Sequence, residues 1–257
     1  MSNLEQIRLL AKEVYLAPDG LMRLDPDDRA PPHRKHGLPT VRNENGIFFA
    51  VIYYYMSALN GLSDEEDAHR FISAVKQLEV EPGLYNRHSG NVVRDEAHDN
   101  LDAICAGSVL FGTSHAAQIV RYGSKNGWSY TNLKPDSWSL RHLLQGGNIS
   151  YRNICAGNVP YLLNFVWMCG GLWINALARK SGSYESDTQL AWMRVGAITL
   201  RFGQMEVPTW MRGLFAVTSI FWMWCTSRKN GWLEGWVVKY YRITHPTRSL
   251  ARALEDN

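Results

Sequence analysis

The chain has 257 residues, of which 46% are hydrophobic and 20% are charged, and its formal net charge is +3. This composition excludes disordered, collagen-like and disulfide-scaffold proteins and predicts one compact domain with a large core. The 27 basic residues are spread from Arg8 to Arg252, so we expect no nucleic-acid partner.

Residues 1–17 are predicted to form an N-terminal helix. Apolar residues recur there at helical spacing, at Leu4, Ile7, Ala11 and Val14. Two glutamates interrupt the segment, so it lacks the unbroken apolar region of a secretory signal. We therefore expect the protein to be cytoplasmic at synthesis.

Residues 18–45 combine many charged residues with five prolines, at positions 18, 26, 31, 32 and 39. Proline lacks a backbone donor and fixes φ, which opposes both helix and strand. This segment is predicted to be an extended arm or a linker.

Residues 46–257 are predicted to form a single helical domain that contains two kinds of helix. Three segments are apolar throughout and predict inner helices buried on every side: 47–60, 159–178 and 213–225. Two segments have a single apolar stripe and predict outer helices: 64–78 and 187–202. The predicted fold class is mainly α, with helical hairpins arranged as an α/α toroid or a large bundle.

Local signals predict where some helices begin and break. Capping-box patterns predict two starts, at Ser63 with Glu66 and at Ser186 with Gln189. The pair Gly146–Gly147 predicts a break. The run from Phe48 to Tyr55 is rich in residues that favour strands, but its length and surroundings favour helix.

Membrane insertion is not predicted, although residues 159–178 have about the length of a bilayer helix. Asn164 and Asn175 oppose that interpretation. No metal site, disulfide or cofactor is predicted either, because the cysteines lie far apart in apolar surroundings that suit buried, reduced thiols: Cys105, Cys155, Cys169 and Cys225.

Ionisable residues are concentrated between positions 87 and 102. On a helix, Asp95, Asp99 and Asp102 fall at i, i+4 and i+7, and His98 lies four residues before Asp102. Crowded carboxylates beside an imidazole can supply a general acid and a general base, so we take these four as candidate catalytic residues. In the alternative interpretation, Asp99 caps a helix and the others form its solvated first turn.

Five further residues are candidates for substrate binding. Three on the same loop can hold an anionic group or pair with the nearby acids: Arg87, His88 and Arg94. Two aromatic residues near a chain break, Trp128 and Tyr130, can stack on sugar rings or fill the core. The letters DEAH at 95–98 match a helicase motif, but the chain has no phosphate-binding P-loop to accompany them.

The succession of apolar and amphipathic helices, with the loop GLYNRHSGNVVRDEAHDN leading into a helix, resembles the six-hairpin α/α-toroid glycan hydrolases and lyases. The resemblance covers about residues 46–240, and the chain is short for a complete toroid. It implies a carbohydrate ligand, with Asp95, His98 and Asp99 as acid/base candidates and Arg87 as a positioning group.

The sequence therefore favours a protein that binds or cleaves a polysaccharide, as a glycoside hydrolase or a polysaccharide lyase if it is an enzyme. The alternative is a structural or assembly subunit, for example of a virus particle. In that interpretation the 18–45 arm wraps a neighbour, the protein is a homo-oligomer or part of a larger particle, and the aromatic surfaces make the contacts.

Overall fold

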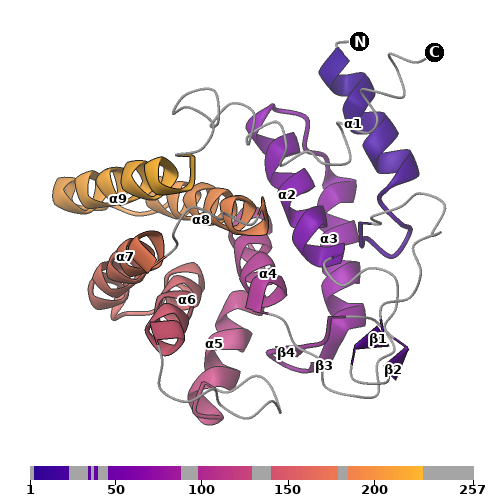
Figure 1. Ribbon diagram of the computed structural model, residues 1–257. Coiled ribbons are helices and arrows are strands. Elements are labelled where there is room, and N and C mark those ends of the chain that lie inside the picture. The colour runs from indigo at the N-terminus through magenta and orange to yellow at the C-terminus, as the bar shows by residue number, and fades with distance from the viewer. Residues whose placement is uncertain are drawn as a thin grey trace.

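The computed structural model describes residues 3–22, 34–35, 38–39, 46–87, 98–128, 140–178 and 185–227. Within them the chain is mainly helical, as predicted (Figure 1). The helices are α1 (Asn3–Val14), α2 (Gly46–Leu59), α3 (Glu65–Leu78), α4 (His98–Phe111), α5 (His115–Lys125), α6 (Leu140–Ala156), α7 (Tyr161–Ala178), α8 (Glu185–Gly203) and α9 (Thr209–Ser227).

The strands of the described residues are short and form two antiparallel pairs. β1 (Arg34–Lys35) pairs with β2 (Leu38–Pro39). β3 (Glu79–Glu81) continues directly from α3 and pairs with β4 (Leu84–Tyr85). Gly83 occupies the turn between β3 and β4 with φ +96°, a conformation that glycine adopts without strain. Arg87 follows this hairpin, and the next described residue is His98, where α4 begins.

Helix α4 lies at the centre of the fold, in contact with α2, α3, α5, α6 and α8 (Figure 1). Every residue from Asn100 to Val109 is buried. Small residues allow this central position: a Cβ atom on Gly107 would lie 2.3 Å from Cε2 of Phe71, so only glycine lets α3 approach this closely.

Helix α2 confirms the predicted helix where the run from Phe48 to Tyr55 had also allowed a strand. Most of α2 is buried, and its aromatic side chains extend into the core. Tyr54 packs edge-on against both Phe71 of α3 and Phe111 of α4. Residues 47–60 therefore form an inner helix, in agreement with the prediction.

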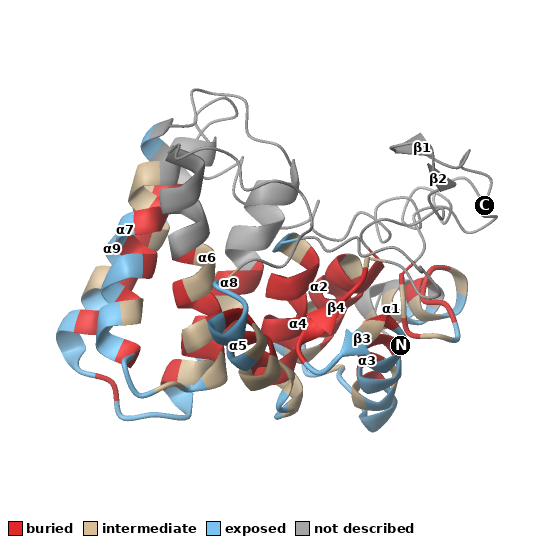
Figure 2. Cartoon of the chain, turned by 90° about the horizontal axis from the view of Figure 1, so that it is seen from below, coloured by how far each residue is buried: buried red, intermediate tan, exposed pale blue. Residues whose placement is uncertain are grey.

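Helices α7 and α9 differ from the prediction that they are buried on every side. Leu163 of α7 is 77% exposed and Val217 of α9 is 54% exposed. Both helices lie at one edge of the molecule, where each packs through one face and leaves the other open (Figures 1 and 2). The mean apolar character of a segment does not record its position in the fold, so an edge helix and an inner helix look alike in sequence.

Three local predictions were also wrong. Helix α3 is capped by Asp64 and Asp67, one residue beyond the predicted pair Ser63 and Glu66. Helix α8 begins at Glu185, so Ser186 lies within the helix and does not cap it. Helix α6 continues through the glycine pair predicted to break it, and Gly147 is buried, where a Cβ would make an ordinary contact at 3.5 Å with Cα of Gly171 in α7.

The predicted N-terminal helix is present as α1, and charged side chains attach it to the start of α3. Arg8 donates to Asp64 at 2.7 Å and to Asp67 at 3.1 Å. Lys12 donates to Asp64 at 3.0 Å and pairs with Glu66 at 2.5 Å. The arm predicted for 18–45 lies mostly outside the described residues.

No helix in the described part of the chain combines the length and the apolar character needed to cross a bilayer. Cys105, Cys155 and Cys169 are buried free thiols, and the side chain of Cys225 is outside what the structure describes. Burial raises the pKa of Cys155 to about 12 and that of Cys169 to about 11, so both remain protonated at neutral pH.

Candidate functional site

Asp102 is the innermost of the predicted catalytic residues. Its side chain has no exposed surface and accepts hydrogen bonds from two arginines on other helices. Arg152 Nε of α6 donates to Oδ1 at 2.9 Å, and Arg194 Nη2 of α8 donates to Oδ2 at 2.5 Å. This buried ion cluster joins three helices around one carboxylate. Because Asp102 cannot reach solvent, it can act on a substrate only through its neighbours.

The two arginines are held by further partners. Arg194 also donates to the side-chain oxygen of Asn148, and its guanidinium lies 5.3 Å from the centre of the Tyr151 ring. Tyr151 is fully buried, and burial raises the pKa of its hydroxyl. Two buried guanidinium groups therefore share the Asp102 carboxylate beneath the first turn of α4.

His98 is the first residue of α4 and is exposed. Nη2 of Arg152 lies 3.4 Å from Nδ1 of His98 and 3.4 Å from its backbone oxygen. A guanidinium carries only donors, so Nδ1 is the accepting atom in this contact. Arg152 thus links the buried Asp102 to the exposed imidazole and orients it.

Asp99 follows His98 in the first turn of α4 and is partly exposed. Burial raises the pKa of its carboxyl, and this effect outweighs the opposing effects of Arg87 and of backbone N–H groups. The N–H of Asn100 donates to Oδ1 of Asp99 at 3.1 Å. Since α4 already begins at His98, Asp99 lies within the first turn and does not occupy the cap position of the alternative interpretation.

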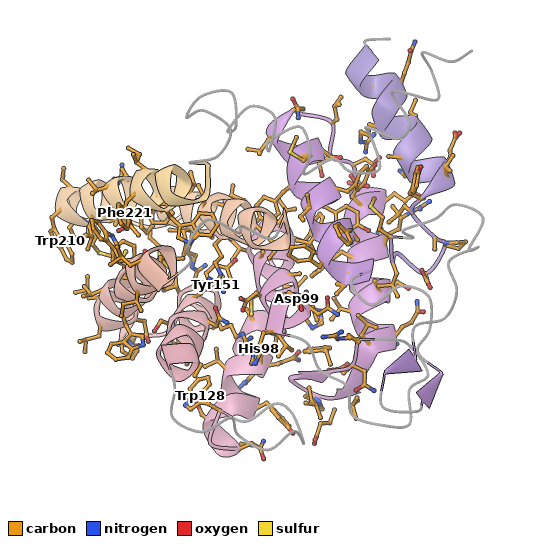
Figure 3. The ribbon with its side chains drawn as sticks, viewed as in Figure 1. His98, Asp99, Trp128, Tyr151, Trp210 and Phe221 are labelled. Atoms are coloured by element: carbon orange, nitrogen blue, oxygen red, sulfur yellow. The ribbon has the colours of Figure 1, made fainter. Side chains whose placement is uncertain are left out.

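Arg87 follows β4 and is partly buried. Its positive charge acts on the Asp99 carboxyl, so the β3–β4 hairpin brings Arg87 to the start of α4. The structure therefore brings together four of the predicted site residues: Arg87, His98, Asp99 and Asp102. Figure 3 shows His98 and Asp99 side by side at the start of α4.

Trp128 lies at the turn after α5, with φ 61°, and packs in part against the hydrophobic core. Its backbone N–H donates to the oxygen of Gly123 at 2.7 Å. Of the two predicted roles of Trp128, stacking on a sugar or packing in the core, this contact agrees with the second. The remaining predicted site residues, His88, Arg94, Asp95 and Tyr130, lie outside the described residues.

Arg152 and Arg194 were not predicted from the sequence, although one signal marks Arg194. It is a lone charge between Met193 and Ala197 on the predicted apolar stripe of α8, whereas Arg152 lies among polar residues such as Ser150 and Asn153. A charge in such a position needs a buried partner of opposite sign. The sequence could have shown that a partner exists, but Asp102 is 50 residues from Arg152 and 92 from Arg194.

A second polar cluster lies between β4 and α5. The Tyr85 hydroxyl donates to Oε1 of Gln118 at 3.1 Å and lies 3.2 Å from Nδ1 of His115. The His115 ring also packs edge-on against Phe71 and Tyr85. These contacts tie His115 into the packing between the hairpin and α5.

Among the described residues no group of three His, Cys, Asp or Glu side chains is placed to hold a metal ion. The chain was compared with protein-family models, curated proteins and solved structures, and none of them matches. The interpretation of the site therefore depends on its own geometry.

Proposed function

We propose that the protein binds or cleaves a polysaccharide at the first turn of α4, with Asp99 as the proton-transferring group. The observation that supports this proposal most is the raised pKa of Asp99, which burial imposes on a carboxyl that remains partly exposed. Such a group holds a proton nearer to neutral pH than a free carboxyl does and can donate it to a ligand.

The neighbours of Asp99 have complementary roles in this proposal. His98 is exposed at the start of α4 and lies against Arg152, so its imidazole can contact a sugar hydroxyl of the ligand. Arg87 binds an anionic group of the ligand or steadies the Asp99 carboxylate after proton transfer. Arg152 and Asp102 act as positioning residues. The positive charge of Arg87, which is only partly buried, favours polysaccharides that carry uronic acids over neutral ones.

In the cleavage reaction, protonated Asp99 gives its proton to the glycosidic oxygen as the bond to that oxygen breaks. A base must then take a proton, either from the attacking water in hydrolysis or from a sugar carbon in a lyase reaction. Asp95, predicted from the sequence as an acid/base residue, is our candidate for this base.

The test is to screen acidic and neutral polysaccharides for binding by calorimetry and for cleavage by the release of reducing ends. Asp99→Asn should abolish cleavage of any substrate found while the chain stays folded. The matched control is Glu65→Gln, which alters an exposed acid in the first turn of α3. Full cleavage by Asp99→Asn, or the absence of binding to every polysaccharide, would contradict the proposal.

The assembly-subunit alternative stays a prediction. It rests on the 18–45 arm, and it predicts that removing this arm abolishes assembly while Asp99→Asn leaves the particle intact. Light scattering of the full chain and of the shortened chain distinguishes the two functions without a substrate.

A further inference from the structure

The exposed side of α7 and α9 is unusually apolar. Eight large apolar side chains on it are between 49% and 77% exposed. We call this set the outer face: Leu162, Leu163, Val166, Trp167 and Leu177 of α7, and Trp210, Val217 and Ile220 of α9. The outer face is distant from the candidate site, as the positions of Trp210 and His98 show (Figure 3).

The two helices present a continuous surface because they pack directly on each other. The Trp173 ring of α7 stacks on Phe221 of α9 with centroids 4.0 Å apart, and its Nε1 donates to Thr218 at 2.9 Å. Phe165 also packs against Phe215. Exposed residues of both helices lie along the same edge of the molecule (Figure 2).

The outer face carries almost no charge. Helix α7 contains no Asp, Glu, Lys or Arg, and Arg212 is the only charged residue of α9. Peripheral membrane helices combine an apolar face with many Lys and Arg residues that attract anionic lipids. The composition of α7 and α9 therefore does not favour a lipid surface, whereas an uncharged face meets no electrostatic repulsion from an identical copy of itself.

The size of the outer face suits a stable protein interface. Its eight side chains, each about half exposed or more, present on the order of 1,000 Å² of apolar surface, and a standard interface buries about 800 Å² per partner. The largest apolar patch of a typical monomer is roughly 300–600 Å². The apolar area of the outer face thus exceeds that of the largest apolar patch on a typical monomer.

Small residues are interspersed with the large ones on the outer face. Three small exposed residues, Gly170, Gly213 and Ala216, lie between the large side chains. Large and small residues on the same face let the projections of one copy enter the hollows of another, which is the self-complementarity that a two-fold interface requires.

We propose that the outer face binds a second copy of this chain, so that the protein is a homodimer joined through α7 and α9. The dimer is independent of the polysaccharide function, because its interface lies away from His98 and Asp99. It leaves both candidate sites of the dimer open to a ligand.

Sedimentation of the full chain over a range of concentrations tests the dimer, with Leu163→Asp as the disrupting variant. Residue 163 lies in the first turn of α7, where an acidic side chain stabilises the helix, so this variant should fold. The matched control is Leu59→Asp, since Leu59 is also a leucine near a helix end and is 64% exposed.

We expect the native chain and Leu59→Asp to sediment as dimers with the same dissociation constant. Leu163→Asp should raise that constant by about 100-fold or more, because the dimer would bury two unpaired carboxylates. A native chain that is monomeric up to about 100 μM would overturn the proposal. So would a dimer that Leu163→Asp leaves unchanged. Binding of the native monomer, but not of Leu163→Asp, to phosphatidylcholine vesicles would assign the outer face to lipid instead.

Discussion

Replacing Asp102 by Asn should destabilise the protein strongly, although the two side chains have nearly the same size. The carboxylate is fully buried and accepts from Arg152 at 2.9 Å and from Arg194 at 2.5 Å. An amide keeps one oxygen acceptor but turns an NH₂ donor towards one of the guanidinium groups. It also removes the negative partner that the two buried guanidinium groups share.

Removing one partner of a buried ion pair costs about 3–5 kcal/mol. A domain of this size has a free energy of unfolding of about 5–15 kcal/mol, so the loss is a large fraction of the total. The corresponding decrease in Tm is on the order of 10 °C. Arg152 and Arg194 share the cost, since each loses a charged acceptor.

The assay is urea unfolding followed by circular dichroism, with Glu65→Gln as an exposed control that should change the free energy of unfolding by less than about 0.5 kcal/mol. Arg194→Met should recover part of the loss when it is combined with Asp102→Asn, because it removes one of the uncompensated charges. A loss below about 1 kcal/mol for Asp102→Asn, or simple additivity in the double variant, would refute the buried ion cluster as a source of stability.

Two further predictions concern packing and pH. Gly107→Ala should lower the free energy of unfolding by roughly 1–3 kcal/mol, because the added Cβ would overlap the Phe71 ring. This loss exceeds the gain of about 1 kcal/mol that alanine gives to a helix. A higher free energy of unfolding for Gly107→Ala in chemical denaturation would disprove this packing. Burial tends to raise the pKa of Asp64, but hydrogen bonds from Arg8 and Lys12 lower it to about 2. The ionised Asp64 therefore stabilises the fold above about pH 4, and this contribution is lost between about pH 4 and pH 2. Because the group is exposed, the contribution is less than about 1 kcal/mol. The Tm difference between the native chain and Asp64→Asn should shrink on acidification, and a difference that stays constant would contradict this ion pair.

The sequence predicted the helical class well because helix signals are local. The apolar stripe of α3, from Phe71 to Leu78, repeats within one segment, so no distant contact is needed to recognise it. The same holds for α2, whose apolar run is long enough for a helix and is uninterrupted by Gly or Pro.

The features that the sequence did not predict depend on where helices meet. The exposure of Leu163 and Val217 follows from the edge positions of α7 and α9, which no local pattern records. The cap of α3 is different, because it is a local capping box of Asp64 with Asp67 that the sequence also contained, one residue beyond the predicted pair.

The candidate site was predicted in part for the same reason. His98 and Asp99 are adjacent in sequence, so their proximity was certain in advance. The sequence pattern also placed Asp102 one turn along the helix from His98, but it did not show that Arg152 and Arg194 bury this carboxylate and that Arg152 orients the imidazole. Sequence spacing located Asp99 and Asp102 on α4. The packing of α6 and α8 against α4 then buries Asp102 and leaves Asp99 partly exposed.

The effects of Asp99→Asn on stability and on polysaccharide cleavage, measured with the same purified protein, distinguish a catalytic role of Asp99 from a structural one. Because the pKa of Asp99 is raised in the folded chain, its ionised form weakens the fold as pH rises above the range of a free carboxyl. At neutral pH we therefore expect the Asp99→Asn variant to have an equal or higher Tm than the native chain and to lack cleavage activity. A variant that is less stable than the native chain and still cleaves would show that Asp99 has a structural role, and it would contradict the proposed site.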